Sequence, residues 1–530
     1  MKVAIIAPPY PLAEAPAPPL GVSYVAAAFL AAGAEVRIFD YIVRRYSREK
    51  LQGEIDAFQP DVVGTTSVTL NFPTAAAILA AAKRHRPEVV TVMGGPHVSF
   101  TAAATLQEYP EIDLIVIGEG EETINVLVNA GFDEAALPRI KGIAFRNNGA
   151  VRVNEPRQFI PDLDSLPLPA RHLLPLSRYR ALGYPISIIT GRGCPYECIF
   201  CQGRRMVGKK LRRRSASLVV DEIATILSYG IDRINIADDL FVSDKRRVRE
   251  VCEEIKRRGL RFAWSAFARV NTVDGETLEI MKDTGCDSIS FGVESGNPEM
   301  LARIKKRITL DQVRRAVRLC NDVGILAHTS FVVGLPGESP QTLEDTDKFA
   351  SSLGSLYGYH ILAPFPGTTI REEVDKYDLE ILTDDWTKYD ANRAITRTSR
   401  LAPEDINAFV DKFEGEIMAG WQRQVRDYQT GVNTPEEDLL VAGYFRTQLV
   451  YRLLSEDLIE RLGRAGGGEG EAVTRDQLCR RLTAETESDD SLVRRTIDDF
   501  ITKGFLKAEG NGEKCPWYWT HNNRIDVLTG

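Results

Sequence analysis

Short apolar runs alternate with helical patterns along the first 145 residues of the chain. Runs rich in Val, Ile and Thr predict strands, and the alanine-rich stretches between them predict helices, such as one over residues 24–32. Strands and helices that alternate in this way indicate a doubly wound parallel sheet, and thus a Rossmann-like α/β domain over residues 1–145. The predicted strands cover residues 3–7, 35–39, 62–66, 89–93 and 114–117.

Small and polar residues follow these strands at their carboxyl ends, where ligands of such sheets bind. Residues 65–69 include four hydroxyl side chains, and Gly94-Gly95-Pro96-His97 and Gly118-Glu119-Gly120-Glu121 follow two later strands. No glycine-rich dinucleotide fingerprint follows the first strand, and the sequence has no phosphate loop that ends in Gly-Lys-Ser/Thr. Nucleotide binding of the usual kinds is therefore not supported.

A second series of strand and helix patterns follows a connector over residues 146–184, which is rich in Pro, Leu and Arg toward its end. Helical patterns lie between the strands, for example over residues 218–228 and 310–323. Six such units over residues 185–383 predict a partial (β/α)6 TIM-type barrel, whose chemistry lies in the loops at the carboxyl ends of its strands. The predicted strands cover residues 186–190, 233–237, 262–267, 288–293, 328–333 and 357–363.

The carboxy-terminal part of the sequence has a different pattern. Residues 384–460 are mainly helical, and residues 461–471 contain three consecutive glycines typical of a flexible linker. Residues 472–530 predict a winged-helix-like domain made of two helices and a hairpin. Its predicted helices cover 475–482 and 492–503, and its predicted strands cover 505–508 and 517–520, joined by a turn at 509–512.

Composition and charge exclude several classes of protein. The 530 residues include 66 Lys and Arg and 74 Asp and Glu, which gives a net charge of −8 and counts against general nucleic-acid binding. No apolar run approaches the length of about 18 residues that a membrane-spanning helix needs. The first residues run directly into a strand pattern, unlike a secretory signal, so we expect a cytoplasmic protein.

The position of the cysteines indicates a metal site. The sequence has eight cysteines and none before Cys194, but Cys194, Cys198 and Cys201 lie within eight residues, directly after the first barrel strand. Thiolate ligands select zinc or iron–sulfur chemistry. A structural zinc site needs a fourth ligand, which would have to come from a distant residue. Three ligands to a four-iron cluster would instead leave one iron open to a substrate or cofactor.

The Cys-x3-Cys-x2-Cys motif at the end of the first barrel strand resembles that of the radical S-adenosylmethionine (SAM) superfamily. The resemblance implies a [4Fe-4S] cluster held by Cys194, Cys198 and Cys201, with SAM bound to its open iron. It also implies Phe200 beside the adenine, a small-molecule substrate, and reduced flavodoxin or ferredoxin as the electron donor. One electron then cleaves SAM to methionine and a 5′-deoxyadenosyl radical.

Later barrel motifs resemble the same family. Asp238-Asp239-Leu240-Phe241 follows the second strand and is similar to the cobalamin-binding branch, although Asp239 is also a candidate cap for the next helix. The segment 292–296 resembles the ribose-binding segment, and 334–338 and 364–368 resemble the motifs after the last two strands. The SAM contacts that the resemblance implies are Phe200, Asp238, Asp239, Arg269, Glu294, Ser295 and Gly334.

The amino-terminal domain resembles the cobalamin-binding domain of such enzymes, through Pro8-Pro9-Tyr10, Pro19-Leu20-Gly21 and the two glycine motifs above. Glycines permit the backbone to approach a large corrin closely. No histidine of the chain has Asp two residues before it, which implies cobalamin without a histidine ligand to cobalt. A local hydrogen bond is the alternative for His97, and a fold without its ligand is the alternative for the domain. The implied cobalamin contacts are Thr65, Ser67, Gly94, Gly95, His97, Gly118, Glu119 and Gly120.

Two further groups of residues have open interpretations. The basic cluster over residues 204–214 is either a solvated face or a docking site for an anionic substrate or an electron-donor protein. Side chains on barrel strands alternate between the cavity and packed layers, so each member of the second group has two possible orientations. This group comprises Trp264, His328, Tyr357, Tyr359 and His360.

Taken with the resemblance, these observations predict a cobalamin-dependent radical SAM methyltransferase. It would act on an unactivated carbon or a phosphorus centre through the 5′-deoxyadenosyl radical and methylcobalamin. One alternative is a cyclase or ring-rearranging enzyme of the same class that transfers no methyl group. Another is a cofactor-sensing regulator whose winged helix binds DNA, which the acidic composition disfavours.

Overall fold

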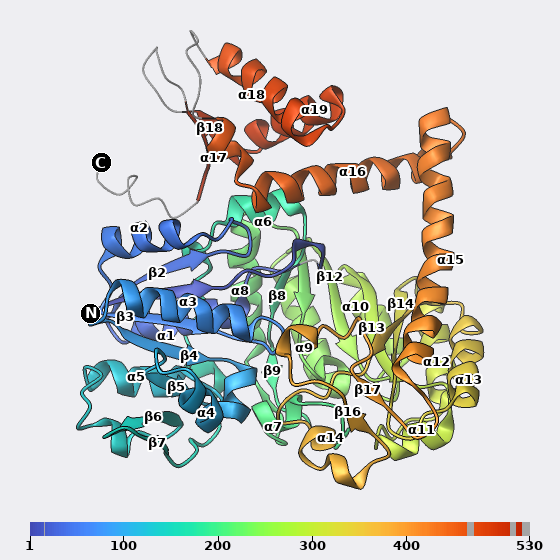
Figure 1. Ribbon diagram of the computed structural model, residues 1–530. Coiled ribbons are helices and arrows are strands. Elements are labelled where there is room, and N and C mark those ends of the chain that lie inside the picture. Colours follow the sequence, from blue (N-terminus) through green and yellow to red (C-terminus); the bar gives the residue numbers. More distant parts are fainter. Residues whose placement is uncertain (15, 464–470, 509–515, 522–530) are drawn as a thin grey trace.

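The computed structural model describes residues 1–14, 16–463, 471–508 and 516–521 (Figure 1). The glycine-rich part of the predicted linker, 464–470, and the predicted turn over 509–512 lie outside these residues. No helix in the described ranges is long and apolar enough to cross a membrane.

The amino-terminal domain is built on a sheet with the strand order β2-β1-β3-β4-β5-β6-β7, in which β1 to β5 are parallel. Alternate residues of each strand face opposite layers. Ile5 and Val92 pack beneath α1 and α5, whereas Ile6 packs against α2, α3 and α4. The elements are β1 Lys2–Ala7, α1 Leu20–Ala31, β2 Glu35–Asp40, α2 Arg48–Phe58, β3 Val62–Thr66, α3 Phe72–His85, β4 Val90–Gly94, α4 Pro96–Glu108, β5 Leu114–Val116 and α5 Glu121–Asn129. The predicted doubly wound sheet and its five strands are confirmed.

An antiparallel hairpin of β6 (Ile143–Asn147) and β7 (Ala150–Val153) extends this sheet past residue 145, where the sequence predicts the end of the domain. Its turn consists of Asn148 and Gly149, with φ of 51° and 81°. An Asn-Gly pair is a strong signal for a two-residue hairpin because both positions need positive φ. This hairpin is therefore visible in the sequence, and it places the end of the sheet beyond residue 145.

The barrel sheet runs in sequence order, β8-β11-β12-β13-β14-β15, and each pair of neighbouring strands is parallel. In the described part of the chain β8 and β15 form no pair, so the barrel is partial, as predicted. The strands are β8 Ile186–Ile188, β11 Arg233–Ile236, β12 Ala263–Ala268, β13 Cys286–Glu294, β14 Leu326–Val333 and β15 Leu356–Ile361. The helices among them are α7 Gly203–Val207, α8 Ala216–Ser228, α9 Lys245–Arg257, α10 Gly275–Asp283, α11 Pro298–Arg303, α12 Leu310–Asp322 and α13 Pro340–Ser351.

Short elements border this sheet. The connector ends in α6 (Leu176–Leu182), and the two-stranded ribbon of β9 (Gly191–Arg192) and β10 (Arg212–Arg213) brackets the cysteine loop. After β15 come α14 (Thr369–Glu372) and a second small ribbon. That ribbon consists of β16 Glu380–Ile381 and β17 Thr396–Arg397.

Two long helices lead to the carboxy-terminal domain (Figure 1). The helix α15 (Pro403–Thr430) rises from the barrel, and α16 (Pro435–Ser455) returns toward the amino-terminal domain. The last described elements are α17 Leu458–Leu462, α18 Glu471–Thr486, α19 Asp490–Thr502, β18 Leu506–Ala508 and β19 Trp517–Trp519. Their core includes apolar residues of α16 and α6, and β18 pairs antiparallel with β19, so the predicted order of two helices and a hairpin is present.

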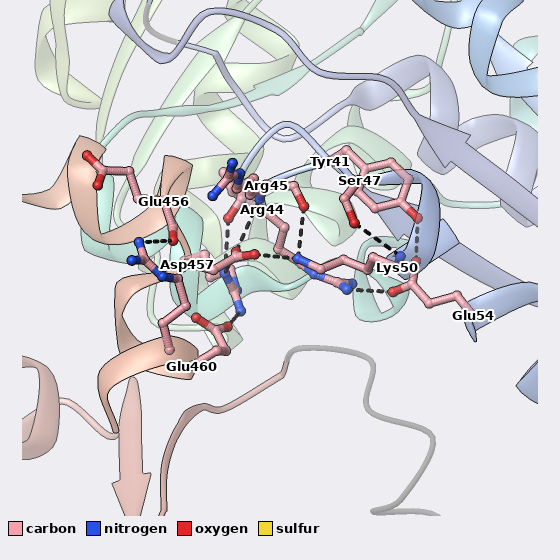
Figure 2. A network of polar contacts seen from close by, with 12 residues as sticks. Tyr41, Arg44, Arg45, Ser47, Lys50, Glu54, Glu456, Asp457 and Glu460 are labelled. Carbon is pink, nitrogen blue, oxygen red and sulfur yellow. Dashed lines mark hydrogen bonds and ion pairs between the residues drawn. The ribbon is translucent and has the colours of Figure 1, made fainter. Parts of the chain in front are cut away.

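A network of charged side chains joins this domain to the amino-terminal domain (Figure 2). Arg178 on α6, whose side chain is 1% exposed, pairs with Glu460 on α17, and its Nη1 lies 4.0 Å from Asp457. Lys50 on α2 also pairs with Asp457, which accepts a hydrogen bond from the backbone N–H of Arg45. We call Arg178, Lys50, Asp457 and Glu460 the C-terminal ion pairs.

Candidate active site

The three clustered cysteines lie in the loop that follows β9 and border one cavity. Cys194, Cys198 and Cys201 are free thiols, and they line a cavity of about 680 Å³ together with residues at the carboxyl ends of β11, β12 and β13. The loop is held by its backbone, since the N–H of Cys194 donates to the carbonyl of Gly208 and that of Ile199 to the carbonyl of Ile304. Buried Ile199 thus fixes the loop between the second and third cysteines.

These residues fit an iron–sulfur cluster. The donor set consists of three thiols on one short loop beside a cavity with room for a further ligand. Among the described residues, no three Cys, His, Asp or Glu side chains are placed to hold a single metal ion. A four-iron cluster does not need that convergence, because each thiolate binds a different iron.

The two aspartates after β11 have different surroundings. Asp238 is buried and accepts hydrogen bonds from the backbone N–H and the hydroxyl of Thr190, at 2.6 and 2.5 Å. Burial raises its pKa to about 6. Asp239 lies near Gly203 and Cys201, and burial raises its pKa as well. Both carboxylates border the cavity, but Thr190 already occupies both oxygens of Asp238, so Asp239 is the better placed of the two for a ligand.

Asp239 does not cap the next helix. The N-cap of α9 is Asp244, whose side chain accepts a hydrogen bond from the backbone N–H of Arg247. The alternative role that the sequence analysis left open for Asp239 is therefore filled by a residue five positions later.

Arg269 and Glu294, two of the predicted SAM contacts, border the same cavity as the cysteines. The guanidinium of Arg269 lies 3.6 Å from the centre of the Tyr196 ring, and its Nη1 lies 3.9 Å from Sγ of Cys198. Glu294 pairs with Lys306 at 2.6 Å and has a φ of 76°. Such strained backbone in a residue other than glycine is typical of functional sites.

Two predicted contacts lie away from this cavity. Ser295 is buried, and its hydroxyl lies 3.2 Å from that of Thr346 and accepts from the backbone N–H of Asn297. Gly334 donates its N–H to Glu338, whose burial raises its pKa to about 8. Neither Ser295 nor Gly334 borders the cavity. Their hydrogen bonds instead hold the backbone of the loops that follow β13 and β14. Phe200 does border the cavity.

A second, smaller cavity of about 90 Å³ lies in the amino-terminal domain between the sheet, α1 and α5. Its walls are apolar apart from Thr65 and Thr66, and Gly95 has a φ of 104° that brings its backbone against Ser67. A Cβ at Gly95 would stand 2.5 Å from the carbonyl oxygen of Ser67. The glycines that line this cavity are Gly64, Gly94, Gly95, Gly118 and Gly120.

These features fit cobalamin. Glycines leave room for a bulky cofactor at the carboxyl ends of the strands, and a narrow apolar cavity suits the flat base of its nucleotide tail. The buried hydroxyl oxygen of Ser67 has no hydrogen-bond partner within the described residues. Thr65, by contrast, already donates its hydroxyl to the carbonyl of Ile6.

His97 is placed by local contacts rather than by a ligand. Its ring is buried, stacks on Phe72 at 4.2 Å and meets the edge of Trp386 at 4.9 Å, and its Nδ1 lies 3.3 Å from the hydroxyl of Thr69. Burial, with a smaller contribution from the charge of Arg371, lowers its pKa to about 4. His97 does not line the glycine-rich cavity, in agreement with the alternative of a local hydrogen bond.

Glu119 and Glu121 connect the two domains. Arg212 donates to both oxygens of Glu119 at 2.8 Å, and Arg192 pairs with Glu119 at 3.2 Å and with Glu121 at 2.5 Å. All four side chains are at most one-tenth exposed. We call them the barrel-side ion pairs. The sequence analysis had predicted Glu119 as a cobalamin contact, but its carboxylate is occupied by two arginines of the barrel.

Gln202 shows how near the two cavities lie. It follows the third cysteine, and its amide nitrogen lies 2.6 Å from the carbonyl oxygen of Pro366 and 3.5 Å from that of Pro96. Pro96 comes directly after the glycines of the smaller cavity. Sequence reasoning missed Gln202, Tyr196 and Lys306. Tyr196 lies in the cysteine motif and Gln202 directly follows it, whereas Lys306 lies in no motif.

Strand alternation separates the aromatic and histidine side chains of the barrel. Trp264 is buried on the outer face and donates to the carbonyl of Thr284. Tyr357 and Tyr359 also lie on the outer face, against Phe413 of α15. A cavity-facing position is therefore wrong for these three, whereas His328 and His360 are exposed on the inner face.

Some residues of the basic cluster over 204–214 form ion pairs within the protein, and others remain exposed. Arg212 and Arg214 are buried in ion pairs, and Arg204 pairs with Glu197. Arg205, Lys209 and Lys210 remain exposed, and Arg205 borders the large cavity. A free basic patch thus remains beside the cysteine loop.

Comparison with known proteins agrees with this arrangement. The family model of the radical SAM superfamily matches residues 188–350, and that of the B12 binding domain matches residues 13–128. An uncharacterized methyltransferase of Pyrococcus horikoshii is 35% identical over 420 residues, which cover 78% of this chain and 91% of the relative. The anaerobic magnesium-protoporphyrin IX monomethyl ester cyclase of Cereibacter sphaeroides is 31% identical over 402 residues, with 73% and 65% covered.

A solved structure shares the whole arrangement. The cobalamin-dependent SAM radical enzyme OxsB, with aqua-cobalamin and SAM bound, has a TM-score of 0.69 at 18% identity, over 94% of this chain and 83% of that chain. This likeness shows the common fold.

The chain therefore belongs to the radical SAM superfamily, in the branch that carries a cobalamin-binding domain. It is an enzyme whose cofactors are a [4Fe-4S] cluster, SAM and cobalamin, as predicted. Of the two predicted reactions, methyl transfer has the stronger support from the relatives. Enzymes of this family need a small-molecule substrate and an external reductant.

Proposed function

We propose that this enzyme transfers a methyl group to an unactivated carbon, or to a phosphorus centre, of a small molecule held between the two cavities. The observation that carries the proposal is the position of Gln202, which directly follows a cluster cysteine and reaches the carbonyl next to the glycine-rich loop. When bound, the cluster and SAM supply a carbon-centred radical, and cobalamin supplies the methyl group.

In this proposal the residues of the large cavity hold and orient the cofactors. Cys194, Cys198 and Cys201 bind three irons of the cluster. The cation of Arg269 is held against the Tyr196 ring, where it offers donors to the carboxylate of SAM. Glu294 accepts hydrogen bonds from the ribose hydroxyls, with Lys306 holding its carboxylate in place.

The glycine-rich loops take the corrin in the same proposal. Gly94, Gly95 and Gly118 allow its close approach, and the unpaired hydroxyl of Ser67 is available to an amide of its rim. His97 is stacked on Phe72 and turned to Thr69, so its ring would be held by these contacts rather than offered to the corrin.

The exposed basic patch of Arg205, Lys209 and Lys210 is the proposed docking site for the reductant. Its Arg205 borders the cavity that Cys201 lines. An acidic partner of the flavodoxin or ferredoxin kind would be steered toward the patch by charge. The three free thiols suit a reducing, cytoplasmic location, which is also part of the proposal.

Anaerobic purification with cobalamin present tests the proposal. Iron, sulfide and corrin are quantified, and formation of 5′-deoxyadenosine from SAM is measured. Cys198→Ala should lose iron and all deoxyadenosine formation, whereas Cys320→Ala, at a buried cysteine of α12, should keep both. Zinc in place of iron, or a well-folded protein without corrin, would contradict the proposal.

The cyclase relative favours a second candidate, ring formation without methyl transfer. SAM labelled in its methyl group separates the two reactions. Label in the product supports methyl transfer, and an unlabelled product with consumption of SAM supports the second candidate.

A further inference from the structure

The inner face of the barrel sheet is unusually empty. In closed barrels, large branched side chains fill the interior in layers. Here the outer face is packed by residues such as Ile236, Phe291 and Phe331, which are buried against the helices. The inward positions carry mostly small residues, and a Cβ at Gly358 would meet nothing within 4 Å. The small inward residues are Ser187, Asn235, Ser265, Ser288, Ser290, Ser330 and Gly358.

One row of inward side chains crosses four neighbouring strands. Strand register places Phe267 beside Ser290, Ser290 beside His328, and His328 beside Leu356. We call these four residues the inner-face row. Three spacings between strands give the row a length of about 14 Å.

Apolar side chains on this surface are left open. Phe267 is 45% exposed and Leu356 is 51% exposed, and Leu326, two residues before His328, is 50% exposed. Exposed apolar groups that continue from a cavity, with a few hydrogen-bonding groups among them, are typical of a small-molecule site. The hydroxyl of Ser290 and the imidazole of His328 are the hydrogen-bonding groups in the row.

The surface is continuous with the cluster cavity. Phe267 and Ser290 belong to the inner-face row and also line the cavity of about 680 Å³ that the three cysteines border. A molecule that begins at the cluster therefore extends along the row. The charged residues of the cavity, such as Arg204, Arg205 and Lys305, belong to α7 and to the turn after α11, and not to the row. The inner-face row itself contains no Asp, Glu, Lys or Arg, so a charged group that lies on the row would lose hydration without gaining a partner there.

We propose that the inner-face row is the substrate surface of this enzyme, and that it takes an uncharged molecule with an extended apolar body. This inference rests on the proposed function and specifies its substrate class. The apolar body lies on Phe267, Leu326 and Leu356, and an oxygen of the substrate accepts or shares a hydrogen bond at Ser290 or His328.

Equilibrium dialysis of the anaerobic holoenzyme tests this inference, with dodecanol as an uncharged probe and dodecanoate as its anionic counterpart. Both probes match the length of the row. We expect dodecanol to bind at least tenfold more tightly than dodecanoate. Leu356→Glu, which places a carboxylate in the row, should weaken the binding of dodecanol at least tenfold, and Phe267→Ser should weaken it severalfold.

Leu439→Glu is the matched control, because Leu439 is 74% exposed on α16, away from the barrel sheet. It should leave the binding of dodecanol unchanged. The inference is overturned if the wild type does not bind dodecanol, if Leu356→Glu binds it as tightly as the wild type, if Leu439→Glu weakens it equally, or if dodecanoate binds more tightly. Iron and corrin contents are measured in each protein. Wild type without them contradicts the proposed function itself, and variants that keep them are correctly folded.

Discussion

Two sets of buried charges join the amino-terminal domain to the rest of the protein, and they differ in what lies beside them. The barrel-side ion pairs hold Glu119 and Glu121, whose neighbours Gly118 and Gly120 line the glycine-rich cavity. The C-terminal ion pairs hold Asp457 and Glu460 of the carboxy-terminal domain against Lys50 of α2 and Arg178 of α6 (Figure 2). One set therefore holds the loop that is proposed to bind cobalamin, and the other anchors a domain.

Glu119 and Glu460 also differ in how their carboxylates are satisfied. Glu119 receives two hydrogen bonds from Arg212 and one from the backbone N–H of Ile160, so both of its oxygens are paired. In the C-terminal set, Nε of Arg178 and Oε2 of Glu460 are buried with no hydrogen-bond partner in the described part of the chain, and in the barrel-side set the same holds for Oε2 of Glu121. A buried carboxylate with one unpaired oxygen, such as that of Glu460, loses more stability when its remaining partner is removed. The comparison predicts that loss of Arg178 is the more destabilising, whereas loss of Arg212 is the more damaging to the cofactor.

The largest effect is expected for Arg178→Met. It leaves Glu460 as an unpaired buried carboxylate, which destabilises the docked carboxy-terminal domain by about 3–5 kcal/mol. Hydrogen exchange should rise in α17 and α6, and the thermal transition should fall. Arg446→Met, which breaks a pair with Asp499 in the same domain whose side chains are 32% and 33% exposed, should change stability by less than about 1 kcal/mol. Loss of corrin in Arg178→Met would contradict the separation of the two sets.

Arg212→Met should act on the cofactor. It removes both hydrogen bonds to Glu119, but Arg192 remains, so we expect a loss of stability of about 2–3 kcal/mol, below that of the first variant. Corrin retained after gel filtration should fall severalfold. The control is Arg213→Met, at the next residue of β10, which breaks a more exposed pair with Asp244. Equal corrin contents in the two variants would show that Glu119 does not position the cofactor loop.

Neither set of ion pairs was visible in the sequence. The apolar periodicity predicts each strand because burial depends on neighbouring residues, and the cysteine spacing predicts the cluster because all three ligands lie on one loop. Arg178 and Glu460, by contrast, lie 282 residues apart, so their pairing depends on how α6 packs against α17 in the folded protein. The motif that contains Glu119 predicts a cofactor loop, and only the structure shows that its carboxylate turns to the barrel.

The sequence also does not show which face of a strand each side chain occupies. Tyr357 and Tyr359 differ from Gly358 and His360 by one position, and a shift of one residue exchanges the two faces of a strand. The register with β14 decides that both tyrosines pack against α15 and that His360 faces inward. Sequence alone leaves that choice open because both faces of β15 contain aromatic or polar side chains.

Acid should weaken the barrel-side and the C-terminal ion pairs, but by less than Arg178→Met or Arg212→Met does. Burial raises the pKa of Glu119 and Glu460, but their arginine partners more than compensate and hold both values below 4.5. A lowered pKa stabilises the fold above the unfolded value, near 4.5, and that contribution is lost as the pH falls through the folded value. Between about pH 5.5 and 3 the wild-type melting temperature should therefore fall. Glu119→Gln and Glu460→Gln should each reduce that fall by about 2–4 °C, as thermal scans would show, and an unchanged fall would contradict the lowered values.

The smallest effect is expected for Lys50→Met, and it sharpens the comparison within the C-terminal set. The Lys50 side chain is 28% exposed, and Asp457 keeps the backbone N–H of Arg45 as a partner, so the loss should be about 0.5–1 kcal/mol. Salt screens exposed charges more than buried ones. Raising the salt concentration to 1 M should therefore erase the difference between wild type and Lys50→Met in thermal scans. It should leave most of the difference between wild type and Arg178→Met, because water and ions do not reach a guanidinium that is 1% exposed. If salt erased both differences equally, the C-terminal ion pairs would be a solvated surface contact rather than a buried anchor.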